Sequence, residues 1–265
     1  MKLSVGGYSF CNSFRAGTMD VFGYLETVKY RYGLDAVDLW NGFFADGTGE
    51  LCRVPDEDYI RKIRQALDER ELILANFAID KAHIWDPDPV EREALHKNAL
   101  DHLKMSAALG AQTVRIDTGI YETTEITEEQ FEYIVNRFRE YCEFAKDNGF
   151  LIGPENHMGP SLVPGTMARI AEAVDHPSYG ILLHIGRWRE DVEQGDAMVA
   201  RWTVHTHFSA HTVTGPEAVE KVRMLRAAGY DGYWAVEYNA PNNQYGEVEW
   251  LLASVKRVLA ASEAE

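Results

Sequence analysis

The sequence predicts an α/β protein of the (β/α)8, or TIM-barrel, class, and three observations carry this prediction. The chain has 265 residues, close to the roughly 250 of a typical barrel of this class. Eight short apolar runs alternate with eight helix-like segments, an order typical of a parallel sheet. No composition break or linker interrupts the alternation, so residues 1–265 are expected to form a single domain rather than two smaller ones.

The expected strands are short apolar runs bounded by glycine, proline or polar residues. In the first of them, Gly6 and Gly7 allow backbones to pack closely. The strands are expected over Leu3–Ser9, Ala36–Trp40, Leu72–Phe77, Thr113–Asp117, Phe150–Glu155, Tyr179–His184, Trp202–Phe208 and Gly232–Glu237.

The expected helices show apolar residues at helical spacing or clear end signals. Thr127 followed by Gln130 resembles a capping box, Pro216 stands in a first turn, and Gly110 ends a helix. The helices are expected over Met19–Tyr32, Asp56–Glu69, Glu91–Leu109, Thr127–Asp147, Thr166–Ala173, Asp191–Ala200, Pro216–Ala228 and Glu247–Ala261.

Three segments are expected to lie outside these elements. Asn41–Glu50 is glycine-rich and predicted to be a surface loop, and Ser262–Glu265 is predicted to be a frayed tail. Asp80–Pro89 is a long loop, and long loops in compact domains are often binding loops or lids. His83 lies in this loop and is predicted to contact substrate as part of a lid.

The bulk composition excludes some classes of partner. A net charge of −16 argues against nucleic acid or an anionic membrane, because phosphate binding needs a basic face. Cys11, Cys52 and Cys142 are scattered, as in a reduced cytoplasmic protein. The N-terminus lacks a signal-peptide pattern and no apolar run approaches a membrane span. A cytoplasmic protein is therefore expected, and a homo-oligomer is compatible with these features.

Four consecutive expected strands end on a residue that can bind metal: Glu155, His184, His207 and Glu237. A single strand-end glutamate is more often a solvated edge residue, and a single strand histidine is more often hydrogen-bonded in the core. The carboxyl ends of barrel strands meet at one mouth, however, and alternation places the four side chains on the inward face. The joint pattern therefore predicts a shared divalent-metal site.

The chemistry of such a site follows from its ligands. Imidazole and carboxylate together suit transition metals better than Ca²⁺; Mn²⁺ is expected, with Co²⁺, Mg²⁺, Fe²⁺ and Zn²⁺ as alternatives. A metal there can polarise a substrate carbonyl and stabilise an enediolate. Glu155 and Glu237, reaching from different strands, could divide the tasks of taking and returning a proton.

Four motifs resemble those of a known superfamily: Pro154–His157, Gly229–Tyr238, Asp86–Ala94 and Ala107–Asp117. Together they make the chain similar, over nearly its whole length, to the sugar isomerase/epimerase superfamily of xylose isomerase-like barrels. That superfamily includes ketose 3-epimerases, hydroxypyruvate isomerases, inosose dehydratases and AP-endonuclease-like proteins. The closing motif, Gly229–Tyr238, is more specific than the helix pattern Asp86–Ala94.

The resemblance implies roles for three strand-end residues, and the sequence departs from the pattern at two places. Glu155 and Glu237 would be metal ligands and the acid/base pair, and His207 the strand-seven ligand. The sixth strand usually ends Asp-x-Gly-His, but here it is His184-Ile-Gly-Arg187; the seventh usually continues His-x-Lys-Asp, but here it is His207-Phe-Ser-Ala. His184 would replace an anionic ligand with a neutral one; alternatively it is not a ligand, which leaves three.

Further residues are candidates for substrate binding. Arg187 could bind a substrate hydroxyl, carboxylate or phosphate. His157 could contact substrate or cap its loop, and Asp117 could contact substrate or pair with Arg115. Trp40 could form an apolar sugar wall or only pack at the rim. The same alternatives apply to Phe77, Trp85 and Trp188.

The function expected from these features is that of a metal-dependent isomerase or epimerase acting on a small keto sugar or related polyol. A lyase is the runner-up: the same enolisation followed by β-elimination gives a dehydratase or a 3-oxo-glycoside-cleaving enzyme. The departures at His184 and Arg187 favour this alternative. A barrel that serves as a non-catalytic subunit is the third alternative, and the presence of both Glu155 and Glu237 argues against it.

Overall fold

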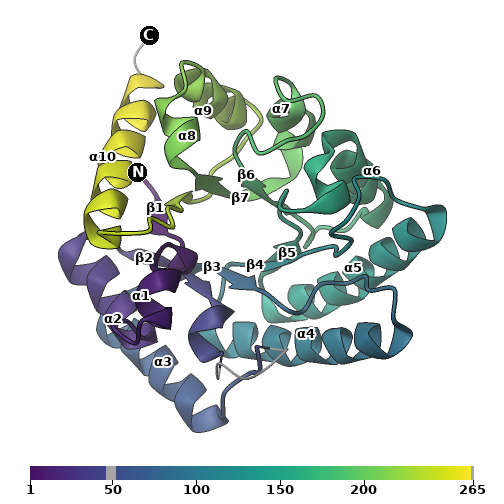
Figure 1. Ribbon diagram of the computed structural model, residues 1–265, viewed down its shortest axis with the longest axis horizontal. Coiled ribbons are helices and arrows are strands. Elements are labelled where there is room, and N and C mark those ends of the chain that lie inside the picture. The colour runs from purple at the N-terminus through teal and green to yellow at the C-terminus, as the bar shows by residue number, and fades with distance from the viewer. Residues whose placement is uncertain (46–51, 264–265) are drawn as a thin grey trace.

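The protein, described from a computed structural model, is a ring of parallel strands surrounded by helices (Figure 1). The structure describes residues 1–45 and 52–263. Within these residues, two four-stranded parallel sheets have the orders β1-β8-β7-β6 and β2-β3-β4-β5. The strands are β1 Leu3–Val5, β2 Ala36–Trp40, β3 Ile73–Ile79, β4 Thr113–Ile116, β5 Leu151–Gly153, β6 Ile181–His184, β7 Thr203–Phe208 and β8 Trp234–Val236. The predicted TIM-barrel class is confirmed.

The helices cover the outside of the ring (Figure 1). They are α1 Cys11–Arg15, α2 Val21–Glu26, α3 Glu57–Glu69, α4 Pro89–Leu109, α5 Glu128–Asn148, α6 Pro164–Val174, α7 Gly195–Val199, α8 Ala210–Thr214, α9 Ala218–Ala227 and α10 Gln244–Ala261. Short helical turns are η1 Gly7–Phe10, η2 Thr27–Arg31, η3 Asn41–Phe44, η4 Gly159–Leu162 and η5 Ala200–Trp202. Among the described residues, none of these helices is long and apolar enough to cross a membrane.

Two seams join the sheets into a closed ring. Between β1 and β2 the contact is a parallel bridge from Gly6 to Asp38. Between β5 and β6, Gly180 donates its backbone N–H to the Ile152 carbonyl at 3.0 Å, and Leu182 donates to Pro154 at 3.0 Å. A Cβ on Gly153 would lie 1.6 Å from the Gly180 carbonyl oxygen, so only glycine allows this seam to close.

The predicted capping box is confirmed at the start of α5. Thr127 Oγ1 accepts from the Gln130 N–H at 3.2 Å, and Gln130 Oε1 accepts from the Thr127 N–H at 2.8 Å. Two otherwise unpaired backbone donors are thereby satisfied. The other end of α5 stops at Gly149, which has the left-handed conformation expected after a helix (φ 76°). This stop aims the chain into β5 and hence toward Glu155.

Several predicted boundaries are wrong, and contacts explain why. The first strand ends at Val5, and the chain turns into η1, where Gly7 lies against Phe43 and Trp40 with no room for a Cβ. The helix predicted over Asp191–Ala200 is reduced to α7.

In that segment the buried Asp196 bonds to the β6–α7 loop. Part of the predicted loop Asn41–Glu50 is the helical turn η3; residues 46–50 lie outside the described residues, as do 264–265 of the predicted tail.

Candidate metal centre and active site

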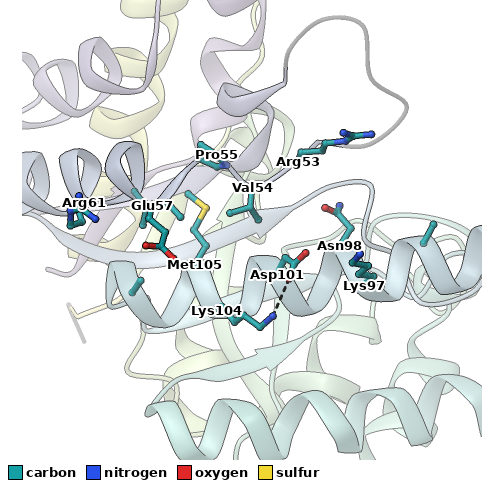
Figure 2. Close-up of a pocket in the computed structure, with 13 residues that line it drawn as sticks. Arg53, Val54, Pro55, Glu57, Arg61, Lys97, Asn98, Asp101, Lys104 and Met105 are labelled. Atoms are coloured by element: carbon teal, nitrogen blue, oxygen red, sulfur yellow. Dashed lines mark hydrogen bonds and ion pairs between the residues drawn. The ribbon is translucent and has the colours of Figure 1, made fainter.

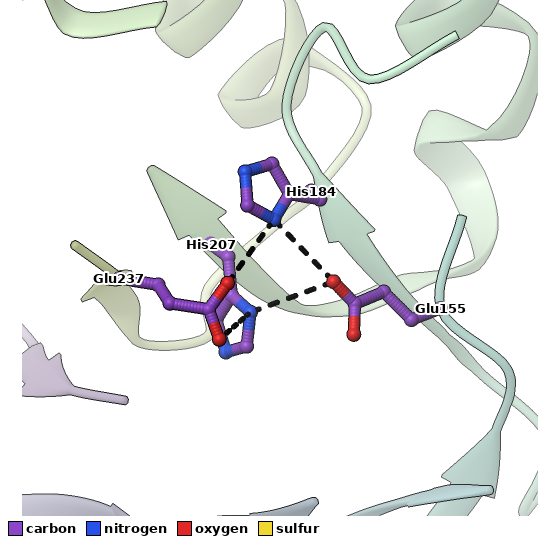
Figure 3. Close-up of side chains that lie close together, drawn as sticks. All are labelled: Glu155, His184, His207 and Glu237. Atoms are coloured by element: carbon purple, nitrogen blue, oxygen red, sulfur yellow. Dashed lines mark ion pairs between the residues drawn. The ribbon is translucent and has the colours of Figure 1, made fainter. Parts of the chain in front are cut away.

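The four predicted strand-end residues meet at the carboxyl end of the barrel. Figure 3 shows Glu155 and Glu237 approaching a common centre from opposite sides, with His184 and His207 between them. His184 Nδ1 lies 3.3 Å from Glu155 Oε1 and 3.6 Å from Glu237 Oε2. His207 Nδ1 lies 3.7 Å from Glu155 Oε1 and 3.8 Å from Glu237 Oε1. We call these four residues the ligand cluster.

The ligand cluster has the donor set and the free atoms that a divalent ion needs. One ligand atom from each residue lies within 4.8 Å of the others. Nδ1 of His184 and Nδ1 of His207 are buried, and neither has a hydrogen-bond partner among the described residues. Leaving a buried nitrogen unpaired is costly, and two imidazoles with two carboxylates form a mixed ligand set for transition metals. The residues therefore fit a metal ion.

Asp38, on β2, holds His207 from behind. Nε2 of His207 donates to Asp38 Oδ2 at 2.7 Å, and Nε2 of His205 donates to the same oxygen at 2.7 Å. Asn76 donates to Asp38 Oδ1 at 2.7 Å. Burial opposes ionisation of Asp38, but the two histidines outweigh it and lower its pKa. An Nε2–H donor leaves Nδ1 of a neutral His207 free to bind metal, which is the usual arrangement behind a metal-binding histidine.

Asp38 was not among the residues predicted from the sequence, although its strand offered a signal. Asp38 alternates with Trp40, so both side chains belong to the same inward face of β2. A carboxylate on the buried face of a strand needs a buried partner. The partner residues are far away in the chain, and nothing in the sequence around β2 indicates them.

Arg115 lies beneath Glu155 at the centre of a second group of charges. Its Nη1 donates to Asp80 Oδ1 at 2.8 Å and to Asp117 Oδ2 at 3.0 Å, and its Nε lies 3.5 Å from Glu155 Oε2. His157 Nδ1 donates to Asp117 Oδ2 at 2.9 Å, and the charges of Asp117 and Glu155 outweigh burial to raise the pKa of His157 to about 9. The predicted Arg115–Asp117 ion pair is present.

Arg187 enters the ligand cluster from the loop after β6. Its Nη1 donates to Glu155 Oε1 at 3.0 Å. Burial would raise the pKa of Glu155, but His157, the cluster histidines and Arg187 together hold it well below its usual value. Glu155 is therefore a carboxylate with a strong set of cationic and hydrogen-bonding neighbours.

A cavity of about 160 Å³ is lined by three members of the ligand cluster, Glu155, His207 and Glu237. The lining includes the backbone turn Gly6–Tyr8, Trp40 and Asp80. The Trp40 ring meets the Tyr8 ring edge to face at 5.2 Å, and its Nε1 donates to Asp80 Oδ2 at 2.7 Å. Of the predicted substrate-binding residues, Trp40, His157 and Arg187 line this cavity. Tyr8 and Asp80 were not identified from the sequence.

The remaining predicted substrate residues lie behind the cavity wall. Asp117 is buried under His157. Nδ1 of His83 shares a hydrogen bond of 2.9 Å with the Tyr121 hydroxyl, and His83 is not among the lining residues. Phe77, Trp85 and Trp188 also pack away from the cavity. Only Trp40 of the predicted aromatic wall borders it, and contact of His83 or Asp117 with substrate stays a prediction.

A larger hollow, of about 930 Å³, lies outside the ring between α3 and α4. Figure 2 shows the side chains that line it, including Lys104, which forms an ion pair with Asp101 at 3.0 Å. It holds none of the groups of metal-competent residues found in the described part of the chain. Size alone therefore does not mark the functional site of this barrel.

Comparison with known proteins supplies a family and a fold. The model of a family described as xylose isomerase-like TIM barrel matches residues 30–256. No curated protein matches the sequence.

Three solved structures illustrate the similarity. A 3-keto-D-glucoside 4-epimerase from E. coli has TM-score 0.75 and 14% identity, covering 97% of this chain and 99% of its own. The probable 3-DHS dehydratase of Bacillus anthracis, involved in petrobactin synthesis, has TM-score 0.69 and 16% identity over 98% and 99%. A xylose isomerase-like TIM barrel protein from Mycobacterium smegmatis in complex with magnesium has TM-score 0.67 and 14% identity over 91% and 90%.

Proposed function

Because the chain belongs to the family of xylose isomerase-like TIM barrels, we propose that it is a divalent-metal-dependent isomerase or epimerase of small keto sugars. The observation that carries the proposal is the ligand cluster, in which two glutamates face each other across two histidines with free Nδ1 atoms. Solved structures of similar fold include a sugar epimerase and a dehydratase. The chain is accordingly proposed to be an enzyme, with a small sugar or sugar derivative as its partner.

A divalent ion held by Glu155, His184, His207 and Glu237 would polarise the substrate carbonyl. The protein contributes the proton transfers. Glu155 is kept ionised by its neighbours and can accept the proton from the carbon next to the carbonyl. Glu237 faces the cavity from the opposite side. In its protonated form it can give a proton to the other face of that carbon, and exchange with water then removes the proton from Glu155 and restores the one on Glu237. Two carboxylates on two faces are what inversion of one carbon requires.

The cavity residues would orient the sugar and limit water. Trp40 and Tyr8 supply an aromatic border, and Gly6 and Gly7 let the backbone approach closely. His157 and Arg187 offer N–H donors at the rim, where they can bond to substrate oxygens. Such fixed contacts set which carbon lies between the two glutamates.

The direct test is solvent proton exchange. The purified protein would be incubated with a panel of ketoses in D2O, and deuterium at the carbon next to the carbonyl would be followed by NMR. Exchange is expected with Mn²⁺, to be lost after complete chelation and to return when Mn²⁺ is restored. Full exchange by the metal-free protein would contradict the proposal. Co²⁺, Mg²⁺, Fe²⁺ and Zn²⁺ would be compared in the same assay.

A lyase is the second candidate, favoured by Arg187 beside both glutamates. A guanidinium in that position can hydrogen-bond to an oxygen that leaves after the proton is removed. Supplying a free ketose and a 3-oxo-glycoside in parallel separates the two candidates. An epimer of the ketose supports the first, and release of the aglycone supports the second.

A further inference from the structure

The Arg187 guanidinium lies beside the glutamate oxygens that a metal ion in the ligand cluster would also bind. Its Nη1 donates to Glu155 Oε1 at 3.0 Å, and its Nη2 lies 3.6 Å from Glu237 Oε2. These are the same two oxygens that lie 3.3 and 3.6 Å from His184 Nδ1. The guanidinium therefore neutralises the two oxygens to which a cation in the ligand cluster would bind.

We propose that Arg187 is a movable cation with two partners. Without metal it pairs with Glu155 and Glu237; with metal in the ligand cluster it turns into the cavity and binds a carboxylate on the substrate. The substrate class is therefore an acidic sugar or polyol acid. This inference rests on the proposed function in one respect, since it requires that the ligand cluster binds a divalent ion.

The geometry around His184 explains why Arg187 gives up its position. Nη2 of Arg187 lies 3.3 Å from Nε2 of His184. A neutral ring that binds metal through Nδ1 carries its hydrogen on Nε2. Two N–H donors would then face each other, and the guanidinium would also lie beside a second cation. Both effects drive the side chain away from the cluster.

The loop around Arg187 confines this movement to the side chain. Asn156 Nδ2 donates to the Arg187 carbonyl at 2.9 Å. Asp196 Oδ1 accepts from the Gly186 N–H at 2.9 Å and from the Trp188 indole at 2.7 Å. The residues on both sides of Arg187 are thus tied to buried polar groups, whereas its side chain is 33% exposed and borders the cavity. The guanidinium can reorient while its backbone stays in place.

A carboxylate is the partner that the cavity charges favour. Arg115 also lines the cavity, but its guanidinium is already paired with Asp80 and Asp117. Of the two arginines that line the cavity, Arg187 is therefore the one whose guanidinium becomes available when a metal binds. His157 also lines the cavity, but its Nδ1 is bonded to the Asp117 carboxylate. The one guanidinium that remains matches the single charge of a carboxylate with a bidentate fork.

The first arm of the test measures Mn²⁺ binding by titration calorimetry on metal-free protein. Arg187→Met is expected to bind Mn²⁺ at least about tenfold more tightly than wild type, because a competing charge is gone. Arg187→Lys, which keeps the charge, should stay closer to wild type. Arg189→Met, an exposed neighbour two residues on, is the matched control and should change nothing. If Arg187→Met does not fold, Arg187→Gln takes its place.

The second arm compares ligands on Mn²⁺-loaded protein. D-gluconate and D-glucitol share six carbons and differ in the carboxylate. Wild type and Arg189→Met are expected to bind gluconate about tenfold more tightly than glucitol, the effect of one charge-assisted pair. Arg187→Met should lose that preference. Glucitol 6-phosphate is the third ligand and should bind less tightly than gluconate.

The outcomes separate this inference from the proposed function. Absence of Mn²⁺ binding by both wild type and Arg187→Met would overturn the proposed function and this inference together. Normal Mn²⁺ binding, with no gain in Arg187→Met, would overturn the movable cation alone. Equal affinity for gluconate and glucitol, or tighter binding of the phosphate ester, would overturn the assignment of a carboxylate.

Discussion

The two sides of the barrel mouth treat their polar side chains differently. Beside β2 and β3, Asp38, Asn76 and Asp80 are hydrogen-bonded within the chain. Beside β6 and β7, His184 and His207 each keep a buried nitrogen without such a partner. Both sides carry groups that could bind a metal, but of the five residues named here only the two histidines keep a buried nitrogen without a hydrogen-bond partner. Among these five residues, internal pairing therefore separates the supporting groups from the two candidate ligands.

Glu237→Gln is the substitution expected to have the largest effect, because it removes a negative charge from the ligand cluster. Loss of one acid/base group should reduce proton exchange roughly 10²–10⁴-fold, and Mn²⁺ content should fall. NMR exchange in D2O and elemental analysis check both. Glu249→Gln, on the outer surface of α10, is the control. Unchanged exchange in a folded, metal-loaded Glu237→Gln variant would show that Glu237 is not part of the reaction.

His184→Ala decides between four protein ligands and three. If His184 is a ligand, its removal should lower Mn²⁺ content and weaken Mn²⁺ binding by at least about a hundredfold, since the free Nδ1 is lost. Elemental analysis after gel filtration, with circular dichroism to verify folding, is the measurement. Unchanged metal content would rule out an essential ligand role and leave His184 as a neighbour of the site.

Metal removal should change stability as well as activity. An ion that binds only the folded protein adds about 2.7 kcal/mol to the free energy of unfolding at a hundredfold excess over its dissociation constant. Thermal unfolding with and without Mn²⁺ measures this, and Glu237→Gln should show little of the increase. An equal increase in wild type and variant would place metal binding elsewhere.

Asp38→Asn tests whether the hydrogen-bonded carboxylate on β2 supports metal binding by His207 on β7. Asp38 holds the Nε2–H of His207 at 2.7 Å, and loss of such a partner typically weakens metal binding about 10–100-fold. The readout is the Mn²⁺ dissociation constant. Asn76→Ala disturbs the same carboxylate without removing its bond to His207, so its effect should be smaller. Equal effects would show that Asp38 serves only the packing of the network.

Trp40→Phe is expected to have the smallest effect. It keeps an aromatic ring at the cavity and removes the Nε1 bond to Asp80. The free energy of unfolding should fall by about 1 kcal/mol, while Mn²⁺ affinity stays unchanged. A rise in KM would support contact between Trp40 and the sugar. A change in Mn²⁺ affinity would mean that the two sides are more closely coupled than their hydrogen bonds indicate.

The sequence alone predicted the barrel and the four side chains that meet at its mouth. Both predictions rest on local patterns: apolar runs alternating with helices, and a polar residue where each of four runs ends. Local patterns do not show which distant groups pair. The bond from Asp38 to His207 spans 169 residues, and His83, in the long loop after β3, is not among the residues that line the cavity. The roles of the four residues stay predictions that the substitutions above examine.

The glycine seam between β5 and β6 has a consequence for how the site could be divided. Glu155 lies on one side of this seam and His184 on the other. A cut between α6 and β6, at residues 175–177, would leave one glutamate on the first fragment and the other three members of the ligand cluster on the second. Neither fragment would then contain all four residues of the proposed metal site. Metal affinity would then become a gauge of whether the two halves have rejoined.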